Sequence, residues 1–261
     1  MGKVLAIANQ KGGVGKTTTS VNLAASLTVT RKNVLLIDLD PQGNATTGSG
    51  IDKASLSLSI YDLLSKNESI EEVLIRPEAG YDLLPANGDL VASEVELMAG
   101  DNREARLRST VDAVRSNYDF IVIDCPPSLN MLTINALVAA DGVVIPMQCE
   151  YYALEGLSAL MDTISAIRDR LNPSLKIEGI LRTMYDPRSK LTSEVNGQLF
   201  NYFGDAVYRT VVPRNVRLAE APSYVKPVIK YDKQSRGAIA YLALAGELLR
   251  RHDEAAAGVS G

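Results

Sequence analysis

A glycine-rich loop near the amino terminus constrains the fold more than any other part of the sequence. Residues 10–18 read Gln-Lys-Gly-Gly-Val-Gly-Lys-Thr-Thr, directly after the apolar run Val4–Ala8 and at the start of the helical pattern Lys16–Thr28. Glycines in a strand-to-helix turn let backbone amides point inward at a phosphate, and the helix adds the positive end of its dipole. Lys16 is then expected to pair the β- and γ-phosphates of Mg-ATP, and the Thr17 hydroxyl to bind Mg²⁺. The expected nucleotide-binding residues of the loop are Lys11, Gly12, Gly13, Val14, Gly15, Lys16, Thr17 and Thr18.

Short apolar runs alternate along the chain with longer helical patterns. The predicted strands are Val4–Ala8, Val34–Asp38, Tyr81–Pro85, Phe120–Asp124, Val143–Met147, Ile177–Met184 and Ala206–Val212, and the predicted helices are Lys16–Thr28, Asn102–Asn117, Leu129–Ala139, Ala153–Leu171, Leu191–Phe203 and Ser235–Arg251. The strands at 34–38, 120–124 and 143–147 are apolar almost without alternation, which is typical of parallel strands covered on both faces. The pattern predicts an α/β fold with a doubly wound, mostly parallel sheet flanked by helices, which binds ligands at the carboxyl ends of its strands.

Length and composition favour one domain and restrict its chemistry. The 261 residues are 46% hydrophobic, so we expect a single domain over residues 1–253 and a disordered tail over residues 254–261. Two cysteines and one histidine are too few for a His/Cys zinc site, and the net charge of −4 is mild. We also expect a cytoplasmic protein, because there is no leader before the first strand and no apolar stretch of roughly 18 to 20 residues.

Two carboxylates complete the predicted site. Asp40 follows the strand Val34–Asp38, and Asp124 ends the strand Phe120–Asp124, so both lie at the edge where the γ-phosphate is expected. We predict that Asp40 orients or deprotonates the attacking water and that Asp124 holds Mg²⁺ through water, with both acids near the metal. Taken singly, Asp38 or Asp124 is also compatible with a simple cap of a strand-to-loop turn.

The glycine-rich loop departs from the common form at its first position, where Gln10 replaces glycine and a second lysine, Lys11, follows. This variant resembles the deviant Walker A motif of the ParA/MinD ATPases, a group of P-loop NTPases in which the extra lysine crosses a dimer interface to the partner's nucleotide. The resemblance implies that Lys11 is this signature lysine, that it acts in catalysis with Lys16, Asp40 and Asp124, and that ATP is enclosed between the protomers of a homodimer.

Four further segments extend the resemblance over nearly the whole chain. They are Asp38–Asn44, Ile123–Ser128, Gln148–Gly156 and Val212–Leu218, and they look like segments of the ParA/Soj chromosome-partitioning ATPases. The resemblance implies that Met184, Pro213 and Asn215 border the adenine. It also implies a ParB-type centromere-binding protein as partner and an association with the nucleoid.

Basic residues gather in one part of this acidic chain. Between Lys176 and Arg236 there are eleven Lys and Arg against six Asp and Glu. Such a stretch could contact phosphates of double-stranded DNA without reading bases, although ordinary solvated surface charge is the alternative for each residue. The candidates are Arg188, Arg217, Arg214, Lys226 and Lys230, with Arg182, Lys190, Lys233 and Arg236 in the same stretch. The family associates the positions of Arg188 and Arg217 with nonspecific DNA binding, and its ATP-bound dimer releases DNA on hydrolysis.

Two other functions remain open. A MinD-like division-site ATPase would need a basic amphipathic helix at the carboxyl terminus, but the leucines at 242, 244, 248 and 249 predict a core face, so we expect no membrane binding. An iron-protein-like redox ATPase, or a cofactor-biosynthesis enzyme on the same nucleotide site, would be indicated by iron at Cys125 or Cys149. Cys125 adjoins a buried strand and precedes two prolines, which favours a role as a small buried hydrophobe. With eight residues before Asn9, we expect no amino-terminal helix-turn-helix.

Overall fold

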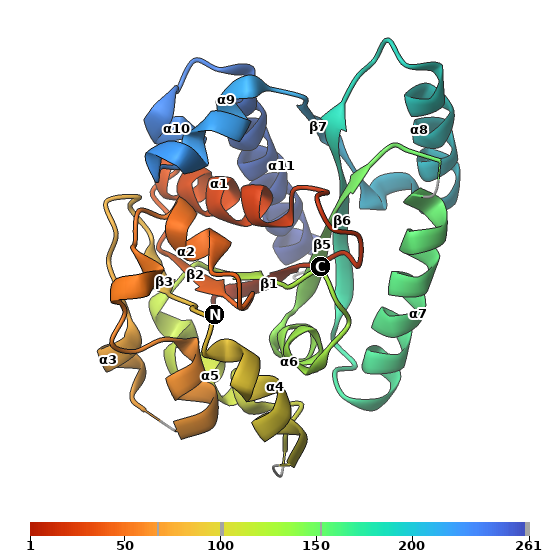
Figure 1. Cartoon of the computed structure of the whole chain (residues 1–261). Helices are drawn as coiled ribbons and strands as arrows, with labels where there is room; N and C mark the ends of the chain where they lie inside the picture. The colour runs from red at the N-terminus through yellow and green to blue at the C-terminus, as the bar shows by residue number, and fades with distance from the viewer. Residues whose placement is uncertain (67, 100–101, 152, 259–261) are drawn as a thin grey trace.

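The computed structural model describes residues 1–66, 68–99, 102–151 and 153–258. Its seven strands form one parallel sheet in the order β3-β2-β4-β1-β5-β6-β7 (Figure 1). The strands are β1 (Lys3–Ile7), β2 (Val34–Asp38), β3 (Asp82–Leu84), β4 (Phe120–Asp124), β5 (Gly142–Gln148), β6 (Lys176–Tyr185) and β7 (Val207–Pro213). Each predicted strand is confirmed to within one residue at either end, and the predicted fold class is confirmed with them.

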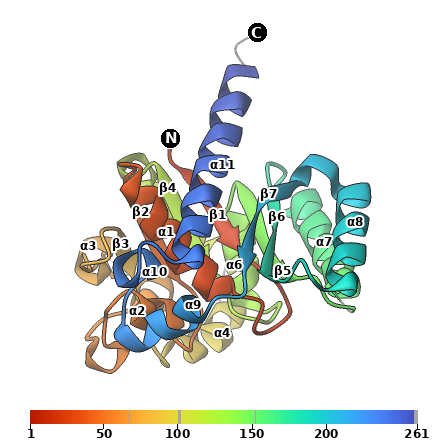
Figure 2. The ribbon, with the colours of Figure 1, turned by 90° about the horizontal axis from the view of Figure 1, so that it is seen from above.

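Helices cover both faces of the sheet. They are α1 (Lys16–Val29), α2 (Asn44–Gly48), α3 (Ile70–Val73), α4 (Leu90–Ala99), α5 (Arg106–Val114), α6 (Met131–Ala139), α7 (Ala153–Arg170), α8 (Lys190–Phe203), α9 (Val216–Glu220), α10 (Val228–Tyr231) and α11 (Arg236–Gly258). Helices α1 and α11 pack together over one face, with α10 beside them, and α4 to α8 lie on the other face (Figures 1 and 2). The molecule is therefore a three-layer α/β/α sandwich.

The alternation of side chains along the strands explains the two outer layers. In β1, Val4 and Ala6 pack into the apolar cluster under α4 to α8, whereas Leu5 and Ile7 pack into the cluster under α1 and α11. Every residue of β2 and β4 is buried. Because both faces of these strands are covered, their sequences are continuously apolar rather than alternating.

Strand order and register bring three strand ends together. Ile7, the last residue of β1, pairs with Asp124 of β4 on one side and with Val144 of β5 on the other. Asp124 in turn pairs with Asp38, the last residue of β2. The loops that leave β1, β2 and β4 therefore start side by side at the carboxyl edge, where open α/β sheets bind their ligands.

The sequence did not predict α2, α3, α4, α9 and α10. All of these except α4 span only four or five residues, which is too short for a helical period to be visible. The predicted helix over residues 102–117 is shorter, since α5 begins at Arg106. Asn102 has a left-handed φ of 53°, so the helix cannot include it.

The prediction of a disordered tail over residues 254–261 is wrong for its first part. Helix α11 continues to Gly258, and its last turns project beyond the rest of the chain in Figure 2. Alanine has the highest helix propensity, and residues 255–257 are all alanine, which explains why the helix continues past Arg251. Residues 259–261 of the predicted tail lie outside the described residues.

Candidate nucleotide site and basic surface

The glycine-rich loop turns through two glycines with left-handed backbone angles. Gly13 has a φ of 73° and Gly15 a φ of 89°, and a side chain at either position would be strained. Gly15 is also the N-cap of α1 and offers no side-chain cap, so the first amides of this helix remain able to bind an anion. A Cβ atom on Gly12 would meet nothing within 4 Å. The loop is therefore shaped to receive a phosphate from its open side.

Lys16, the first residue of α1, is buried beside this loop. Lys16 is only 7% exposed, and its Nζ donates a hydrogen bond to the carbonyl oxygen of Lys11 at 3.0 Å. Burial lowers the pKa of Lys16, and the nearby acids Asp124 and Asp40 are among the groups that oppose this shift. Because little water surrounds this ammonium group, its attraction for a phosphate is screened less than at the surface.

Asp124, the last residue of β4, is fully buried and has one oxygen without a partner. Its Oδ1 accepts a hydrogen bond from the Ser20 hydroxyl at 2.7 Å, whereas Oδ2 has no hydrogen-bond partner among the residues that the structure describes. Burial, followed by the charge of Asp38, raises the pKa of Asp124 to about 8, against the opposing effect of the Ser20 and Thr17 hydroxyls. A buried carboxylate oxygen of this kind normally has a partner.

The surroundings of Asp124 fit Mg²⁺ better than a metal bound by protein alone. Mg²⁺ typically takes one or two carboxylates and completes its shell with water and substrate phosphates. The unpartnered Oδ2 of Asp124 and the neighbouring Thr17 hydroxyl offer ligands of this type. Among the described residues no three His, Cys, Asp or Glu side chains converge as a closed metal cage would require.

We expect Asp124→Asn to raise the melting temperature of the protein without nucleotide and Mg²⁺. Above the ordinary pKa of 3.8 the unfolded chain releases a proton that folded Asp124 keeps until about pH 8, so this carboxyl lowers the free energy of unfolding as the pH rises through that window. The neutral amide removes the penalty, and at pH 8 the Tm should rise by at least about 2–4 °C. The gain should shrink toward pH 5.

Differential scanning calorimetry at both pH values measures this difference. Asp112→Asn on α5 removes an exposed acid and serves as the control. A gain for Asp124→Asn that is the same at both pH values would show that burial of its charge is not the cause.

The two acids at the carboxyl end of β2, Asp38 and Asp40, have different surroundings. The Oδ2 atom of Asp38 accepts hydrogen bonds from the amide and the hydroxyl of Thr46, both at 2.7 Å. Burial raises the pKa of Asp38 to about 6, although the bonds from Thr46 lower it. Asp40 is 8% exposed and close enough to Lys16 and Asp124 to affect the pKa of both. The capping interpretation therefore describes Asp38, whereas Asp40 belongs to the group of charges at the loop.

The side chain of Lys11 points away from its own loop. Its Nζ lies 2.6 Å from Oε2 of Glu150 in the segment after β5, and both side chains are about half exposed. The Lys11 amide donates to Oδ1 of Asn9 at 2.9 Å, and Asn9 donates to the carbonyl of Pro146 at 2.8 Å, which fixes the backbone. An exposed ion pair contributes about 0–1 kcal/mol. Breaking the pair to redirect Lys11 therefore requires little free energy.

A cavity of about 240 Å³ opens beside the glycine-rich loop. It brings Gly15 and Thr18 together with Met184, Pro213 and Asn215 from the ends of β6 and β7. The rest of its lining consists of Thr183, Val212, Arg214, Leu218, Ala219 and Tyr241. An apolar cavity with a few polar groups is typical of a small-molecule site. The three residues that the resemblance associates with adenine thus share one cavity next to the loop.

Sequence reasoning assigned no role to Ser20, Asn9, Glu150 and Thr183, which support the site. The Thr183 hydroxyl donates to the carbonyl of Val14 at 2.8 Å and so ties β6 to the loop. Ser20 could have been found, because it lies four residues after Lys16 and therefore on the same side of α1. The other three contacts depend on side chains whose direction or partner the sequence does not reveal.

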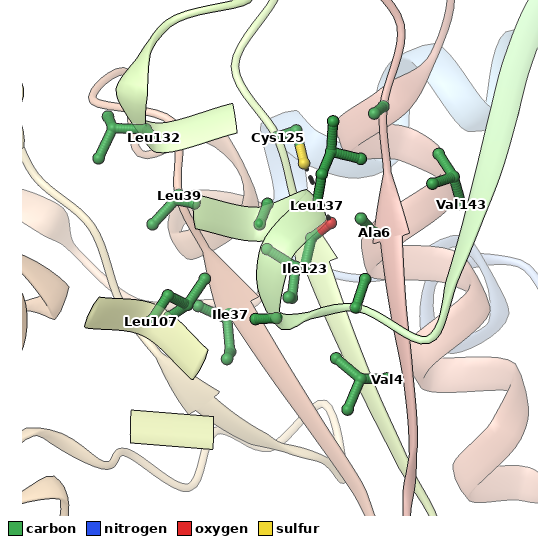
Figure 3. Close-up of a cluster of buried hydrophobic side chains, with 14 of the residues drawn as sticks. Val4, Ala6, Ile37, Leu39, Leu107, Ile123, Cys125, Leu132, Leu137 and Val143 are labelled. Atoms are coloured by element: carbon green, nitrogen blue, oxygen red, sulfur yellow. Dashed lines mark hydrogen bonds between the residues drawn. The ribbon is translucent and has the colours of Figure 1, made fainter. Parts of the chain in front are cut away.

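Both cysteines are buried in the same apolar cluster. Figure 3 shows Cys125 among the buried side chains of this cluster, with its thiol directed at the carbonyl oxygen of Ile123, and Cys125 is only 1% exposed. Burial raises the pKa of both thiols, which disfavours the thiolate that binds a metal. The surroundings support the packing role that the sequence predicts.

Three of the four leucines of the predicted stripe on α11 pack on the core, whereas Leu242 is half-buried and lies outside the cluster. Leu244 and Leu248 are each 1% exposed, and Leu249 packs at the edge of the same cluster. In the described part of the chain we find no helix with the length and hydropathy that a membrane span requires.

Two of the candidate DNA-binding arginines are already paired with acids. Arg188 donates two hydrogen bonds to Asp186, from Nε at 3.0 Å and from an Nη atom at 2.9 Å. Arg217 lies 2.7 Å from Glu220 and 3.4 Å from Asp232. Each arginine keeps further exposed N–H groups, since 88% of the Arg188 side chain and 51% of the Arg217 side chain are exposed, so a phosphate can bind beside the carboxylate.

The other basic candidates differ from these two. Lys226 and Lys230 form no salt bridge with the described residues and line a cavity away from the loop, whereas Arg214 lines the cavity beside the loop. Arg182 is buried, and one of its Nη atoms donates to the carbonyl of Tyr208 at 2.6 Å. Arg182 therefore stabilises the edge strand β7 rather than presenting its charge to solvent.

The fold and the site define this chain as a P-loop nucleoside triphosphatase. The defining features are a parallel sheet with a glycine-rich loop after its central strand, a buried lysine, and an acid at the end of the next strand. Comparison with known proteins narrows this class. A family model described as an AAA domain matches residues 2–177. The chain is 54% identical to the sporulation initiation inhibitor protein Soj of Bacillus subtilis, over 95% of this chain and 98% of the relative. It is 52% identical to the chromosome partitioning protein ParA of Myxococcus xanthus, over 96% and 89% respectively.

The chain belongs to the ParA/Soj family of chromosome-partitioning ATPases, which confirms the resemblance found in the sequence. Among solved structures, it resembles cobyrinic acid a,c-diamide synthase from Mycobacterium smegmatis with bound ATP analog and magnesium, with a TM-score of 0.86 and 38% identity over 97% of this chain and 96% of the other. The cell division ATPase MinD of Pyrococcus furiosus has the same fold, with a TM-score of 0.79 at 23% identity over 96% and 99%.

Proposed function

We propose that this chain is a Mg²⁺-dependent ATP hydrolase that dimerises on ATP, binds DNA nonspecifically and releases it on hydrolysis. The observation that carries the proposal is the meeting of three features at one sheet edge. These are the left-handed turn at Gly13 and Gly15, the buried ammonium group of Lys16 and the unpartnered oxygen of Asp124. The names of the relatives, and the ATP analog and magnesium in the similar synthase structure, support it.

Each residue of the site has a distinct role in this proposal. The amides of residues 11–18 bind the phosphates, Lys16 pairs the β- and γ-phosphates, and Thr17 and Asp124 hold Mg²⁺, with Asp40 also near the metal. When bound, Mg²⁺ neutralises charge on the phosphates. Asp40 orients or deprotonates the attacking water. The adenine occupies the cavity of Met184, Pro213 and Asn215.

Dimerisation in this proposal uses the second lysine of the loop. Lys11 leaves Glu150 and reaches the nucleotide of the other protomer, so that ATP joins two copies of the chain. The weak, half-exposed ion pair of Lys11 supports this exchange because it is easily replaced. A buried or multiply bonded Lys11 would have opposed it.

Dimerisation also explains how ATP could control DNA binding. One protomer offers a small number of basic side chains, and pairing two protomers doubles the possible phosphate contacts. Hydrolysis then separates the protomers and releases the DNA. In this proposal a ParB-type centromere-binding protein is the partner, and the protein is cytoplasmic and associated with the nucleoid.

We expect Arg217→Glu to weaken DNA binding by at least about tenfold without changing the affinity for ATP. Each lost phosphate contact reduces the slope of log K against log salt by about 0.9, and the new acid adds repulsion next to Glu220 and Asp232. Fluorescence anisotropy of a labelled duplex, in a salt series with ATP, with ADP and without nucleotide, measures this.

The matched control is Arg170→Glu, which reverses an exposed charge on α7. This helix covers the face of the sheet opposite to the face that carries Arg217. DNA binding by the wild type that is weak and equal in all three nucleotide states would contradict the proposed switch. Retention of DNA by Arg217→Glu at the wild-type level would place the DNA contacts elsewhere.

A further inference from the structure

Asp40 lies at the start of a tight turn. The amide of Gly43 donates a hydrogen bond to the carbonyl oxygen of Asp40 at 2.8 Å, which closes a β-turn over residues 40–43. Pro41 occupies the second position of this turn and Gly43 the fourth, as is typical of a type I turn. The amide of Gln42 donates to Oδ1 of the Asp40 carboxylate at 2.9 Å. The position of the Gln42 backbone therefore sets the direction of this carboxylate.

The turn packs against the main chain that follows β3. Gly43 has a left-handed φ of 60°, and a Cβ atom there would lie 2.7 Å from the carbonyl oxygen of Ala86. The amide of Ala86 donates to Oγ1 of Thr46 at 2.9 Å, and the same hydroxyl donates to Asp38 at the end of β2. The segment that contacts the turn is thus anchored to the sheet, which leaves the turn little freedom where the two meet.

A lysine side chain also holds this turn. The Nζ atom of Lys53 donates to the carbonyl oxygen of Gln42 at 2.5 Å, and a Cβ atom on Gly43 would lie 2.9 Å from Cδ of Lys53. The Gln42 carbonyl and the Gly43 amide belong to one planar peptide group, so the bond from Lys53 fixes the plane of the group whose N–H donates to Asp40. Hydrogen bonds that follow one another in this way also strengthen each other. Lys53 is thus linked to Asp40 through a single peptide group.

The backbone of Lys53 is itself fixed. Lys53 begins a one-turn 3-10 helix, Lys53–Ser55, in which the Asp52 carboxylate accepts a hydrogen bond from the amide of Ala54 at 3.0 Å. The Ser55 hydroxyl donates to the carbonyl of Asp52 at 2.8 Å. In the part of the chain that the structure describes, the half-buried Lys53 forms no salt bridge. The carbonyl of Gln42 therefore takes the place of an acid as the partner of this ammonium group.

We propose that Lys53 is a positioning residue for ATP hydrolysis, which fixes the turn after Asp40 and thereby the direction of the Asp40 carboxylate. This inference rests on the proposed role of Asp40 with the attacking water. A displacement of about 1 Å at a reacting group can reduce a rate by about 100-fold. Loss of Lys53 should therefore slow the chemical step and leave the binding of Mg-ATP, which depends on the glycine-rich loop and Lys16, unchanged.

The test is steady-state ATP hydrolysis by Lys53→Met and Lys53→Arg, with Lys32→Met as the matched control. Lys53→Met should lower kcat by about tenfold to 100-fold and keep KM for Mg-ATP within about twofold of the wild type. Lys53→Arg keeps a cationic donor for the carbonyl and should recover most of the rate. Lys32 is half-buried like Lys53 but lies at the amino ends of the strands, so its replacement should change neither constant.

The Tm of each variant verifies folding. Lys53→Gln, which keeps an uncharged donor, replaces Lys53→Met if the latter does not fold, and its kcat should lie between those of the wild type and Asp40→Ala.

A double-mutant cycle tests whether Lys53 acts through Asp40 rather than through general stability. Single-turnover hydrolysis of radiolabelled ATP, which resolves slow rates, is measured for Asp40→Ala and for Asp40→Ala combined with Lys53→Met. Residues that act as a unit have non-additive effects, so the combined variant should hydrolyse ATP at the rate of Asp40→Ala alone. A further fall of about tenfold in the combined variant would overturn the proposal, because Lys53 would then act on another part of the site.

Failure of this inference and failure of the proposed function give different results. If the wild type hydrolyses ATP and Lys53→Met matches its kcat, the positioning role is wrong and the proposed function stands. The positioning role is also wrong if Lys53→Met raises KM while kcat stays at the wild-type value, because Lys53 would then contribute to binding. If the wild type does not hydrolyse ATP, the proposed function is wrong and this inference fails with it.

Discussion

Lys16→Ala should weaken the binding of Mg-ATP by at least about 100-fold. The ammonium group of Lys16 is buried at the start of α1, beside the open side of the glycine-rich loop. A hydrogen bond to a charged group contributes about 1.5–3 kcal/mol, and Lys16 is expected to contact two phosphates, so the loss reaches at least about 3 kcal/mol. Isothermal titration calorimetry measures the affinity directly.

Two further variants separate the charge of Lys16 from its packing. Lys16→Met keeps a chain of similar length without the ammonium group and should lose nearly as much affinity as Lys16→Ala. Lys32→Ala removes a lysine just before β2, at the amino ends of the strands and away from the nucleotide loop, and should bind Mg-ATP normally. Wild-type affinity in Lys16→Met would show that the charge does not contact the phosphates.

Asp40→Ala should reduce ATP hydrolysis by about 100-fold to 10,000-fold, the usual contribution of a positioned general base. Binding of Mg-ATP should remain close to that of the wild type, because Lys16 and the loop supply most of the contacts with the phosphates. Asp40 is nearly buried and lies beside Lys16 and Asp124. We therefore assign it a role in activating the attacking water rather than in binding the nucleotide. A phosphate-release assay under saturating ATP measures the rate.

A second substitution tests whether the carboxylate or only its hydrogen bond matters. The Oδ1 atom of Asp40 accepts a bond from the amide of Gln42 at 2.9 Å, which shapes the loop after β2. Asp40→Asn preserves an acceptor for this amide and removes the charge. If Asp40→Asn hydrolyses ATP normally while Asp40→Ala does not, the residue shapes the loop and is not a base. A normal rate in Asp40→Ala would remove Asp40 from the mechanism altogether.

The fold could be predicted wherever a local pattern determines the structure. Strands β2 and β4 are buried on both faces, so their sequences are continuously apolar and their limits match the prediction. The glycine-rich loop is recognisable because its glycines, its lysine and the flanking elements are contiguous. Asp124 could be placed because parallel strands end at one edge. The short helices α2, α3, α9 and α10 could not be predicted, since five residues or fewer carry no period.

The site could be predicted only in part, because several contacts join distant parts of the chain. The hydrogen bonds that Asp38 accepts from the amide and hydroxyl of Thr46 depend on the turn into α2, which the sequence did not reveal. The ion pair between Lys11 and Glu150 spans 139 residues. The cavity that is lined by Arg76, Lys226 and Lys230 joins segments that lie far apart in the sequence. Charge counting along the sequence could not find it, because Arg76 lies outside the basic stretch.

The mass of the protein in solution tests most directly whether ATP joins two protomers. Analytical ultracentrifugation of Asp40→Ala, which is expected to bind ATP without consuming it, is carried out with saturating Mg-ATP, with Mg-ADP and without nucleotide, beside Lys16→Ala. We predict that Asp40→Ala doubles its mass from the 28.1 kDa of one chain only with Mg-ATP, and that Lys16→Ala remains a single chain throughout. A mass of one chain for Asp40→Ala saturated with Mg-ATP would contradict control of DNA binding by an ATP-bound dimer.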